Sequence, residues 1–256
     1  MSPRLAFALE AAHTAGRMTL AHFQTETSVE MKSDLTPVTV ADRAAERLIR
    51  EMIQREYPGD DILGEEEGGD DSANNRWIID PIDGTKSFIS GVPLYATLVS
   101  YEQDRRPVVA ACYFPALDEM IYAEIGAGTY MNGRKCQVRA AENVEGTVLC
   151  CGGHRSMLGM NRMEGFLNLA ERALATRTWS DAYGHALVAS GKVDAMLDPT
   201  VSRWDISSMS LIVREAGGVF VDFQGFDSLD HPRADGLYEA ISTSPQLLPR
   251  LLAAFQ

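Results

Sequence analysis

The chain has 256 residues, of which 45% are hydrophobic, and its formal net charge is -13. This length and composition suffice to bury a substantial core, as one large domain or two closely packed ones. A surface this acidic repels nucleic-acid phosphates and anionic membranes, so we expect neither as a partner. No uninterrupted apolar run reaches ~18 residues, so we expect no membrane span.

The four cysteines give no sign of a zinc site. They form no CxxC pair and no histidine cluster lies beside them: Cys112, Cys136, Cys150 and Cys151. Reduced thiols are the simplest account, so we expect a cytoplasmic protein.

The first half of the chain predicts helices packed on a largely antiparallel sheet. Apolar residues at helical spacing from Leu5 to Ala15 indicate a first helix rather than a signal peptide. After a loop at 32–37, Thr39 has the position of an N-cap, with Asp42 three residues on as in a capping box. Short apolar runs then predict strands over 77–80, 94–101, 107–114 and 120–125.

The second half predicts alternating strands and helices. We expect strands over 147–151, 193–197 and 219–223, and helices over 183–190 and 204–216. A further helix is expected through Phe166, Leu169, Ala173 and Leu174. This alternation is typical of an α/β unit, so we place a boundary near residue 145, between an N-terminal α+β half (1–145) and a C-terminal α/β half (146–256).

The densest chemical motif is the run Asp80-Pro81-Ile82-Asp83-Gly84-Thr85. Pro81 fixes φ and Gly84 permits a sharp turn, so two carboxylates can point at one spot. Oxygen ligands without histidine or cysteine favour Mg²⁺ or Mn²⁺. The alternative is an acidic turn in which Asp83 caps a helix over 84–90, whose first N–H groups would also suit an anion.

Two further acidic segments can complete such a site. The run 64–68 places three glutamates between glycines, which is typical of a solvated loop, and the pattern alone does not select one glutamate as a ligand. Asp205 follows Trp204 in the first turn of a predicted helix, where an acid also caps the helix end.

Together these segments resemble the inositol monophosphatase family. The motifs DPIDGT at 80–85, GEE at 64–66 and WD at 204–205 stand in that family's order and approximate spacing. VTVAD at 38–42 and GAGTYMNG at 126–133 also match, so the resemblance covers essentially the whole chain. It implies a layered αβαβα sandwich and a magnesium-dependent phosphomonoesterase.

The resemblance also implies a role for each matching position. Glu65 would be a metal ligand, Asp80 would bridge two metals, and Asp83 would hold one of them. The Ile82 carbonyl and Asp205 would complete the ligand set. Thr85 and Asp42 would orient the attacking water, and Asp83, Gly84 and Thr85 would contact the substrate phosphate; a helix cap is the simpler role for Asp42.

Substrate choice depends on acids outside the metal site. As the resemblance implies, Asp181 stands where inositol-specific relatives have a small apolar residue that faces the sugar ring. Asp198 stands where they have an acid that bonds a ring hydroxyl. Two carboxylates suit a substrate with a cationic tail. The segment 179–185, DGTKSF at 83–88 and MLDP at 196–199 resemble the histidinol-phosphatase branch, which serves histidine biosynthesis. Asp181 has helix capping as its alternative role.

Several alternatives stay open at this point. The substrate is L-histidinol phosphate, an inositol monophosphate or a broader set of monoesters, while no basic cluster is visible for the second phosphate of a bisphosphate. A non-catalytic metal- or phosphate-binding regulator is the alternative from another class. By family analogy we expect a homodimer and inhibition by Li⁺.

The remaining polar residues have simpler roles. We expect His185 to be structural or to line the substrate site, His154 to border it, and Trp204 to anchor the core. Lys32 and Asp34 carry surface charge in a loop.

Overall fold

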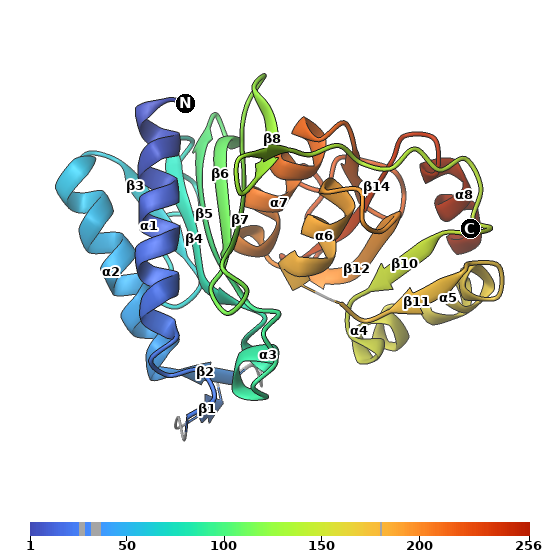
Figure 1. The fold of residues 1–256 in the computed structure, drawn as a ribbon, viewed down its shortest axis with the longest axis horizontal. Helices are drawn as coiled ribbons and strands as arrows, with labels where there is room; N and C mark the ends of the chain where they lie inside the picture. Colours follow the sequence, from blue (N-terminus) through green and yellow to red (C-terminus); the bar gives the residue numbers. More distant parts are fainter. Residues whose placement is uncertain (26–28, 32–36, 180) are drawn as a thin grey trace.

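Two β-sheets and the helices packed on them form the scaffold (Figure 1). The computed structural model describes residues 1–25, 29–31, 37–179 and 181–256. Lys32, Asp34 and Ser180 therefore lie outside the described residues. Within the described part of the chain, none of the helices has the length and apolar character needed to cross a bilayer.

The first sheet has seven strands in the order β3-β4-β5-β6-β7-β8-β9. Its pairs are antiparallel except β3 with β4, which is parallel. The elements of this half are α1 (Pro3–Thr19), β1 (Val29–Met31), β2 (Pro37–Thr39), α2 (Val40–Glu56), β3 (Asp61–Gly64), β4 (Arg76–Asp83), α3 (Thr85–Ile89), β5 (Ala96–Gln103), β6 (Arg106–Phe114), β7 (Glu119–Glu124), β8 (Gly128–Met131) and β9 (Arg134–Lys135).

The second sheet has five strands in the order β11-β10-β12-β14-β13. Strand β10 pairs in parallel with β11 and β12, whereas β14 is antiparallel to both of its neighbours. The elements of this half are β10 (Val148–Cys151), α4 (His154–Gly159), α5 (Met163–Ala170), β11 (Ala175–Arg177), α6 (Asp181–Ala189), β12 (Ala195–Val201), α7 (Arg203–Glu215), β13 (Val219–Val221), β14 (Tyr238–Thr243), α8 (Leu248–Leu252) and the short 3₁₀ helix η1 (Ala253–Phe255).

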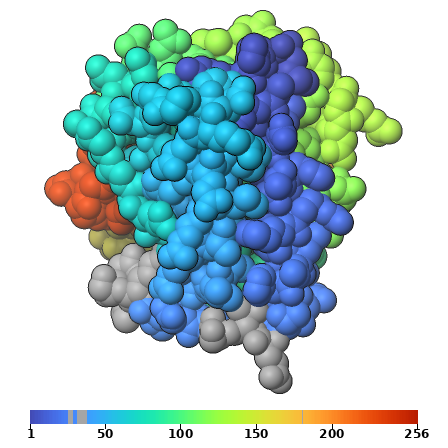
Figure 2. Space-filling model, turned by 90° about the vertical axis from the view of Figure 1, so that its left-hand side faces the viewer, coloured from blue at the N-terminus to red at the C-terminus, as the bar shows by residue number. Residues whose placement is uncertain are grey.

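The layers alternate across the molecule and confirm the predicted αβαβα sandwich. Helices α1 and α2 cover the outer face of the first sheet and lie side by side in Figure 2. Helices α6 and α7 lie between the two sheets, and α4, α5 and α8 cover the far face of the second (Figure 1). One apolar core joins Leu98 and Ala110 of the first sheet to Ala186, Ile206 and Ile212 of α6 and α7. We keep the division near residue 145 as a proposal.

The capping signals in the sequence are confirmed. Thr39 and Asp42 form a capping box at the start of α2, and Ser202 and Asp205 form another at the start of α7. Each box satisfies N–H groups that have no partner within the helix.

One predicted helix is too long. Helix α5 ends at Ala170, residues 171–174 form a turn, and the edge strand β11 (Ala175–Arg177) follows directly. Ala173 and Leu174 continue the helical pattern, but the Leu174 N–H donates to the Thr147 carbonyl at 2.9 Å, and this leads the chain into β11 beside β10. Leu174 is consequently 72% exposed.

Candidate active site

Three aspartates from two distant parts of the chain meet at one point. Oxygen atoms of Asp80, Asp83 and Asp205 all lie within 4.8 Å of one another. The first two stand at the end of β4 and the third in the first turn of α7. Like charges this close repel, so the arrangement suits a bound cation.

A β-bulge turns both β4 aspartates to the same side. In a regular strand, residues three apart point to opposite faces. Here Asp80 pairs with Leu98 and Asp83 with Ala96, so β4 contains one residue more than β5 over this stretch. The extra residue falls at Pro81–Ile82, where proline cannot donate a ladder hydrogen bond.

The next turn is fixed by glycine and by a hydroxyl group. Gly84 has φ 80° and caps the five-residue helix α3 without a side-chain hydrogen bond. The alternative role of Asp83, as the cap of this helix, is therefore wrong. The Thr85 hydroxyl instead donates to the Ile82 carbonyl at 3.1 Å, while Asp83 accepts the Ala182 N–H at the start of α6 at 2.8 Å.

Burial and mutual repulsion raise the pKa of all three acids. Burial raises the pKa of Asp80 well above its ordinary value, and Glu65 and Asp83 add to that rise. Burial and then Asp181 and Asp205 raise the pKa of Asp83. Burial likewise raises the pKa of Asp205 to about 6. The cluster is thus costly to ionise unless positive charge is supplied.

Glu65 is the glutamate of the 64–68 run that lines the same cavity. Its N–H donates to the carbonyl of Ile79, next to Asp80, at 3.2 Å. The backbone of the next two residues, Glu66 and Glu67, is held by a side chain of α2. The buried carboxylate of Glu46 accepts the N–H groups of Glu66 at 2.7 Å and Glu67 at 3.0 Å. No role was predicted for Glu46, because its position in the sequence of α2 does not indicate that it is buried.

Asp42 lies in the first turn of α2, and Thr85 is the first residue of α3. Asp42 is fully buried, and its Oδ2 accepts the Thr39 N–H at 2.8 Å and the Thr39 hydroxyl at 2.5 Å. Its neighbour Ala41 packs in one apolar cluster with Ile82. Thr85 lines the cavity. The predicted Asp42–Thr85 pair stays a prediction.

A cavity of about 590 Å³ surrounds the acid cluster. Among the described residues, the cavity is lined by the ammonium group of Lys86 and by six carboxylates: Glu65, Asp80, Asp83, Asp181, Asp198 and Asp205. Lys86 belongs to the DGTKSF motif but had no predicted role. Trp204, which we expected to anchor the core, is only partly buried and also lines the cavity.

Asp181 and Asp198 both line this cavity and repel each other electrostatically. Burial, followed by Asp181, raises the pKa of Asp198. Asp198 precedes a second Asp-Pro bulge, where Asp198 pairs with Ala240 and Val201 with Tyr238. It also packs tightly on Gly152, since a Cβ there would lie 2.6 Å from Asp198 Oδ1. Asp181 has φ 58° at the first residue of α6.

His185 is a structural histidine that also lines the cavity. Its Nδ1 lies 2.8 Å from the Ser242 hydroxyl, its ring packs against Phe220, and burial lowers its pKa to about 3. The ring is therefore neutral at physiological pH. His154 is exposed, whereas its neighbours Gly153 and Ser156 contribute to the lining.

A model of the inositol monophosphatase family matches residues 1–256. The chain belongs to this family. It is 44% identical over 232 residues to a histidinol-phosphatase of Chlorobaculum parvum, covering 90% of this chain and 89% of the relative. It is 37% identical over 212 residues to an inositol-1-monophosphatase of Mesorhizobium japonicum, covering 79% of each.

Solved structures of inositol monophosphatase family proteins have the same fold. The extragenic suppressor protein SuhB of Bartonella henselae superimposes with a TM-score of 0.91 at 28% identity, covering 100% of this chain and 99% of that one. Family membership makes this chain a phosphoric monoester hydrolase that acts on small phosphate monoesters. The inositol monophosphatase family is metal-dependent, and the cavity residues fit a hard cation. Among the described residues Oδ1 of Asp80 is buried and has no hydrogen-bond donor, so it is available as a ligand.

Proposed function

We propose that the chain is a magnesium-dependent histidinol-phosphatase, which hydrolyses L-histidinol phosphate to L-histidinol and phosphate. The observation that carries the proposal is the pair Asp181 and Asp198, which supply two carboxylates to the cavity beyond the Asp80, Asp83 and Asp205 cluster. L-histidinol phosphate carries an ammonium group and an imidazole, and carboxylates that line a cavity are suited to bind both. An inositol ring offers only neutral hydroxyl groups.

The metal would be held by oxygen atoms alone. Glu65, Asp80, Asp83, Asp205 and the Ile82 carbonyl would be its ligands, a set that favours Mg²⁺ and admits Mn²⁺. Bound magnesium supplies positive charge for the phosphoryl oxygens and makes water a stronger nucleophile. We expect Li⁺ to inhibit by competing for these acidic ligands.

The protein's own groups would position the reactants. Asp83, Gly84 and Thr85 would contact the phosphate, since all three line the cavity beside the acid cluster. Thr85, paired with Asp42 and assisted by Glu65, would orient the attacking water for in-line displacement. Asp181 and Asp198 would hold the cationic end of the substrate. We further propose a cytoplasmic homodimer, by analogy with the family.

A substrate comparison tests the proposal. With Mg²⁺ present, we expect kcat/KM for L-histidinol phosphate to exceed that for myo-inositol 1-phosphate by about 100-fold, since two charge-assisted contacts contribute on the order of 3 kcal/mol. Fructose 1,6-bisphosphate and adenosine 3′,5′-bisphosphate serve as further comparison substrates. Equal or reversed rates for the first two compounds would leave an inositol monophosphatase or a broad-specificity phosphatase.

A further inference from the structure

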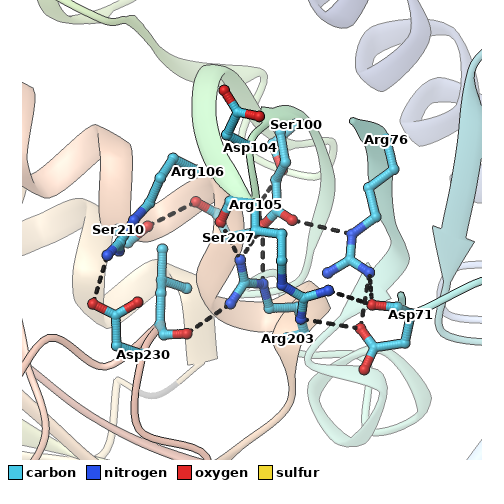
Figure 3. Close-up of polar contacts among 12 residues, drawn as sticks. Asp71, Arg76, Ser100, Asp104, Arg105, Arg106, Arg203, Ser207, Ser210 and Asp230 are labelled. Atoms are coloured by element: carbon cyan, nitrogen blue, oxygen red, sulfur yellow. Dashed lines mark hydrogen bonds and ion pairs between the residues drawn. The ribbon is translucent and has the colours of Figure 1, made fainter. Parts of the chain in front are cut away.

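A buried carboxylate joins the two halves of the molecule behind the acid cluster. Glu102 is at the end of β5 and is 0% exposed. Its Oε2 accepts a hydrogen bond from Arg76 Nε at 3.1 Å, and its Oε1 accepts one from Arg203 Nε at 2.9 Å. The Ser207 hydroxyl donates to the same Oε1 at 2.9 Å. Figure 3 shows Arg76 of β4 together with Arg203 and Ser207 of α7 among these polar contacts.

The two arginine partners of Glu102 are the first residues of the two elements that carry the clustered aspartates. Arg76 is the first residue of β4, which ends in Asp80 and Asp83. Arg203 is the first residue of α7, and Asp205 follows two residues later. Arg76 also pairs in register with Glu102 across the β4–β5 ladder. One carboxylate therefore connects the start of a strand in the first half to the start of a helix in the second.

The helical geometry makes this connection relevant to Asp205. With 3.6 residues per turn, Arg203 and Ser207 lie on the same face of α7, whereas Asp205 is about 200° away from Arg203 around the axis. Two contacts to Glu102 thus fix the rotation of the first turns of α7. A rotation of the helix would move Asp205 away from Asp80 and Asp83 on the opposite side.

The negative charge of Glu102 distinguishes it from the other hydrogen-bond acceptors of Arg203. Arg203 is 5% exposed, and its remaining N–H groups donate to two backbone carbonyls, those of Leu229 at 2.9 Å and Arg105 at 2.6 Å. Carbonyls satisfy hydrogen bonds but carry no net charge. Glu102 is therefore the carboxylate that balances this guanidinium among the described residues, at 2.8 Å from its Nη2. A buried charge without such a partner is strongly unfavourable.

We propose that Glu102 is a positioning residue for the metal site: it sets the rotation of α7 relative to β4, so that Asp205 reaches Asp80 and Asp83. The inference rests on the proposed role of these three aspartates as magnesium ligands. Glu102 acts through Arg203, Ser207 and Arg76, and does not itself line the cavity.

Calorimetric titration of the folded, substrate-free protein with Mg²⁺ alone tests this inference. We expect Glu102→Gln to raise the Kd for Mg²⁺ by about 10-fold or more, in the range found when residues that orient metal ligands are removed. Ser207→Ala removes one donor to Glu102 and the 2.9 Å contact with the Ser100 hydroxyl, yet leaves every charge in place. For this milder variant we expect a rise of about three-fold.

Two controls separate positioning from a general loss of stability. Ser210→Ala removes a buried hydroxyl of the same helix that donates to the Ser207 carbonyl at 2.9 Å. Glu239→Gln disrupts another buried ion pair, with Arg162 at 3.1 Å, that lies wholly within the second half. Both should bind Mg²⁺ within about two-fold of the wild type, because neither contacts Glu102 or Arg203.

Asp205→Asn distinguishes failure of this inference from failure of the proposed metal site. If Asp205→Asn weakens Mg²⁺ binding while Glu102→Gln and Ser207→Ala bind as the wild type does, the positioning role is overturned and the metal site stands. If Asp205→Asn also binds normally, both proposals fall. Should Glu102→Gln not fold, the comparison of Ser207→Ala with Ser210→Ala decides the matter.

Discussion

Asp83 accepts a hydrogen bond from the backbone N–H of Ala182 at 2.8 Å, although 99 residues separate the two in sequence. Ala182 is in the first turn of α6, where N–H groups lack partners within the helix and the helix dipole favours negative charge. The bond thus links the end of β4 to a helix of the second half. It also leaves Asp83 with one carboxylate oxygen for other uses.

Replacing Asp83 by asparagine separates its two contributions. The amide oxygen of Asp83→Asn can still accept the Ala182 N–H, but the negative charge is lost. We expect hydrolysis to fall by at least about 100-fold, while the melting temperature changes by only about 2–4 °C. Initial rates and thermal unfolding measure the two effects. Asp118→Asn, at a surface turn with φ 53°, is the matched control and should stay active. An active Asp83→Asn protein would mean that the site is misassigned.

Substrate selection should depend on Asp181 and Asp198 separately from catalysis. Asp181→Asn and Asp198→Asn each remove one charge that would pair with the cationic end of L-histidinol phosphate. We expect KM for that substrate to rise by about 10-fold, corresponding to ~1.4 kcal/mol. Hydrolysis of p-nitrophenyl phosphate, which has no cationic group, should change by less than about two-fold. A similar loss of activity toward both substrates would indicate that these residues act in the phosphate or metal site instead.

The loop that carries Glu65 should be sensitive to a single methyl group at Gly64. A Cβ at this position would lie 2.2 Å from Oε1 and 2.6 Å from Cδ of Glu46. Glu46 is buried and holds the N–H groups of Glu66 and Glu67, so it has little room to move. We expect Gly64→Ala to cost about 1–3 kcal/mol in the free energy of unfolding and to weaken Mg²⁺ binding. Gly59→Ala meets nothing within 4 Å and should leave both quantities unchanged.

His185 should make the protein sensitive to acid. Burial lowers the pKa of His185 to about 3, whereas the unfolded value is near 6.5. The unfolded state therefore binds the proton first, and stability present above pH 6.5 is lost as the pH falls toward 3, at up to about 1.4 kcal/mol per pH unit. Urea unfolding between pH 7 and 5 should show a steeper loss for the wild type than for His185→Asn. Equal slopes would contradict a neutral buried ring.

The sequence motifs located the acid cluster, but not the local geometry that assembles it. The family resemblance carried by GEE, DPIDGT and WD selected Glu65, Asp80, Asp83 and Asp205 as candidates. What pattern reasoning did not supply is the bulge in β4. Strand periodicity places Asp80 and Asp83 on opposite faces, and only the register against β5 reveals the extra residue.

Sequence patterns also did not predict the residues that act through tertiary contacts. Glu46 and Glu102 are charged residues in a helix and a strand, where solvent exposure is the ordinary expectation. Their burial depends on Arg50 for Glu46, and on Arg76 and Arg203 for Glu102. Edge strand β11 was missed for a related reason, because its pairing with β10 joins segments that are distant in the sequence.

The close approach of Gly152 and Asp198 links two positions in the evolution of this site. Any side chain at 152 would occupy the space of the Asp198 carboxylate, since even a Cβ would lie 2.6 Å from its Oδ1. The carboxylate at 198 is therefore compatible in its present position only with glycine at 152. A variant that gained a larger residue at 152 would have to move or lose this carboxylate, and with it the group that we propose helps to distinguish a cationic substrate from a neutral one.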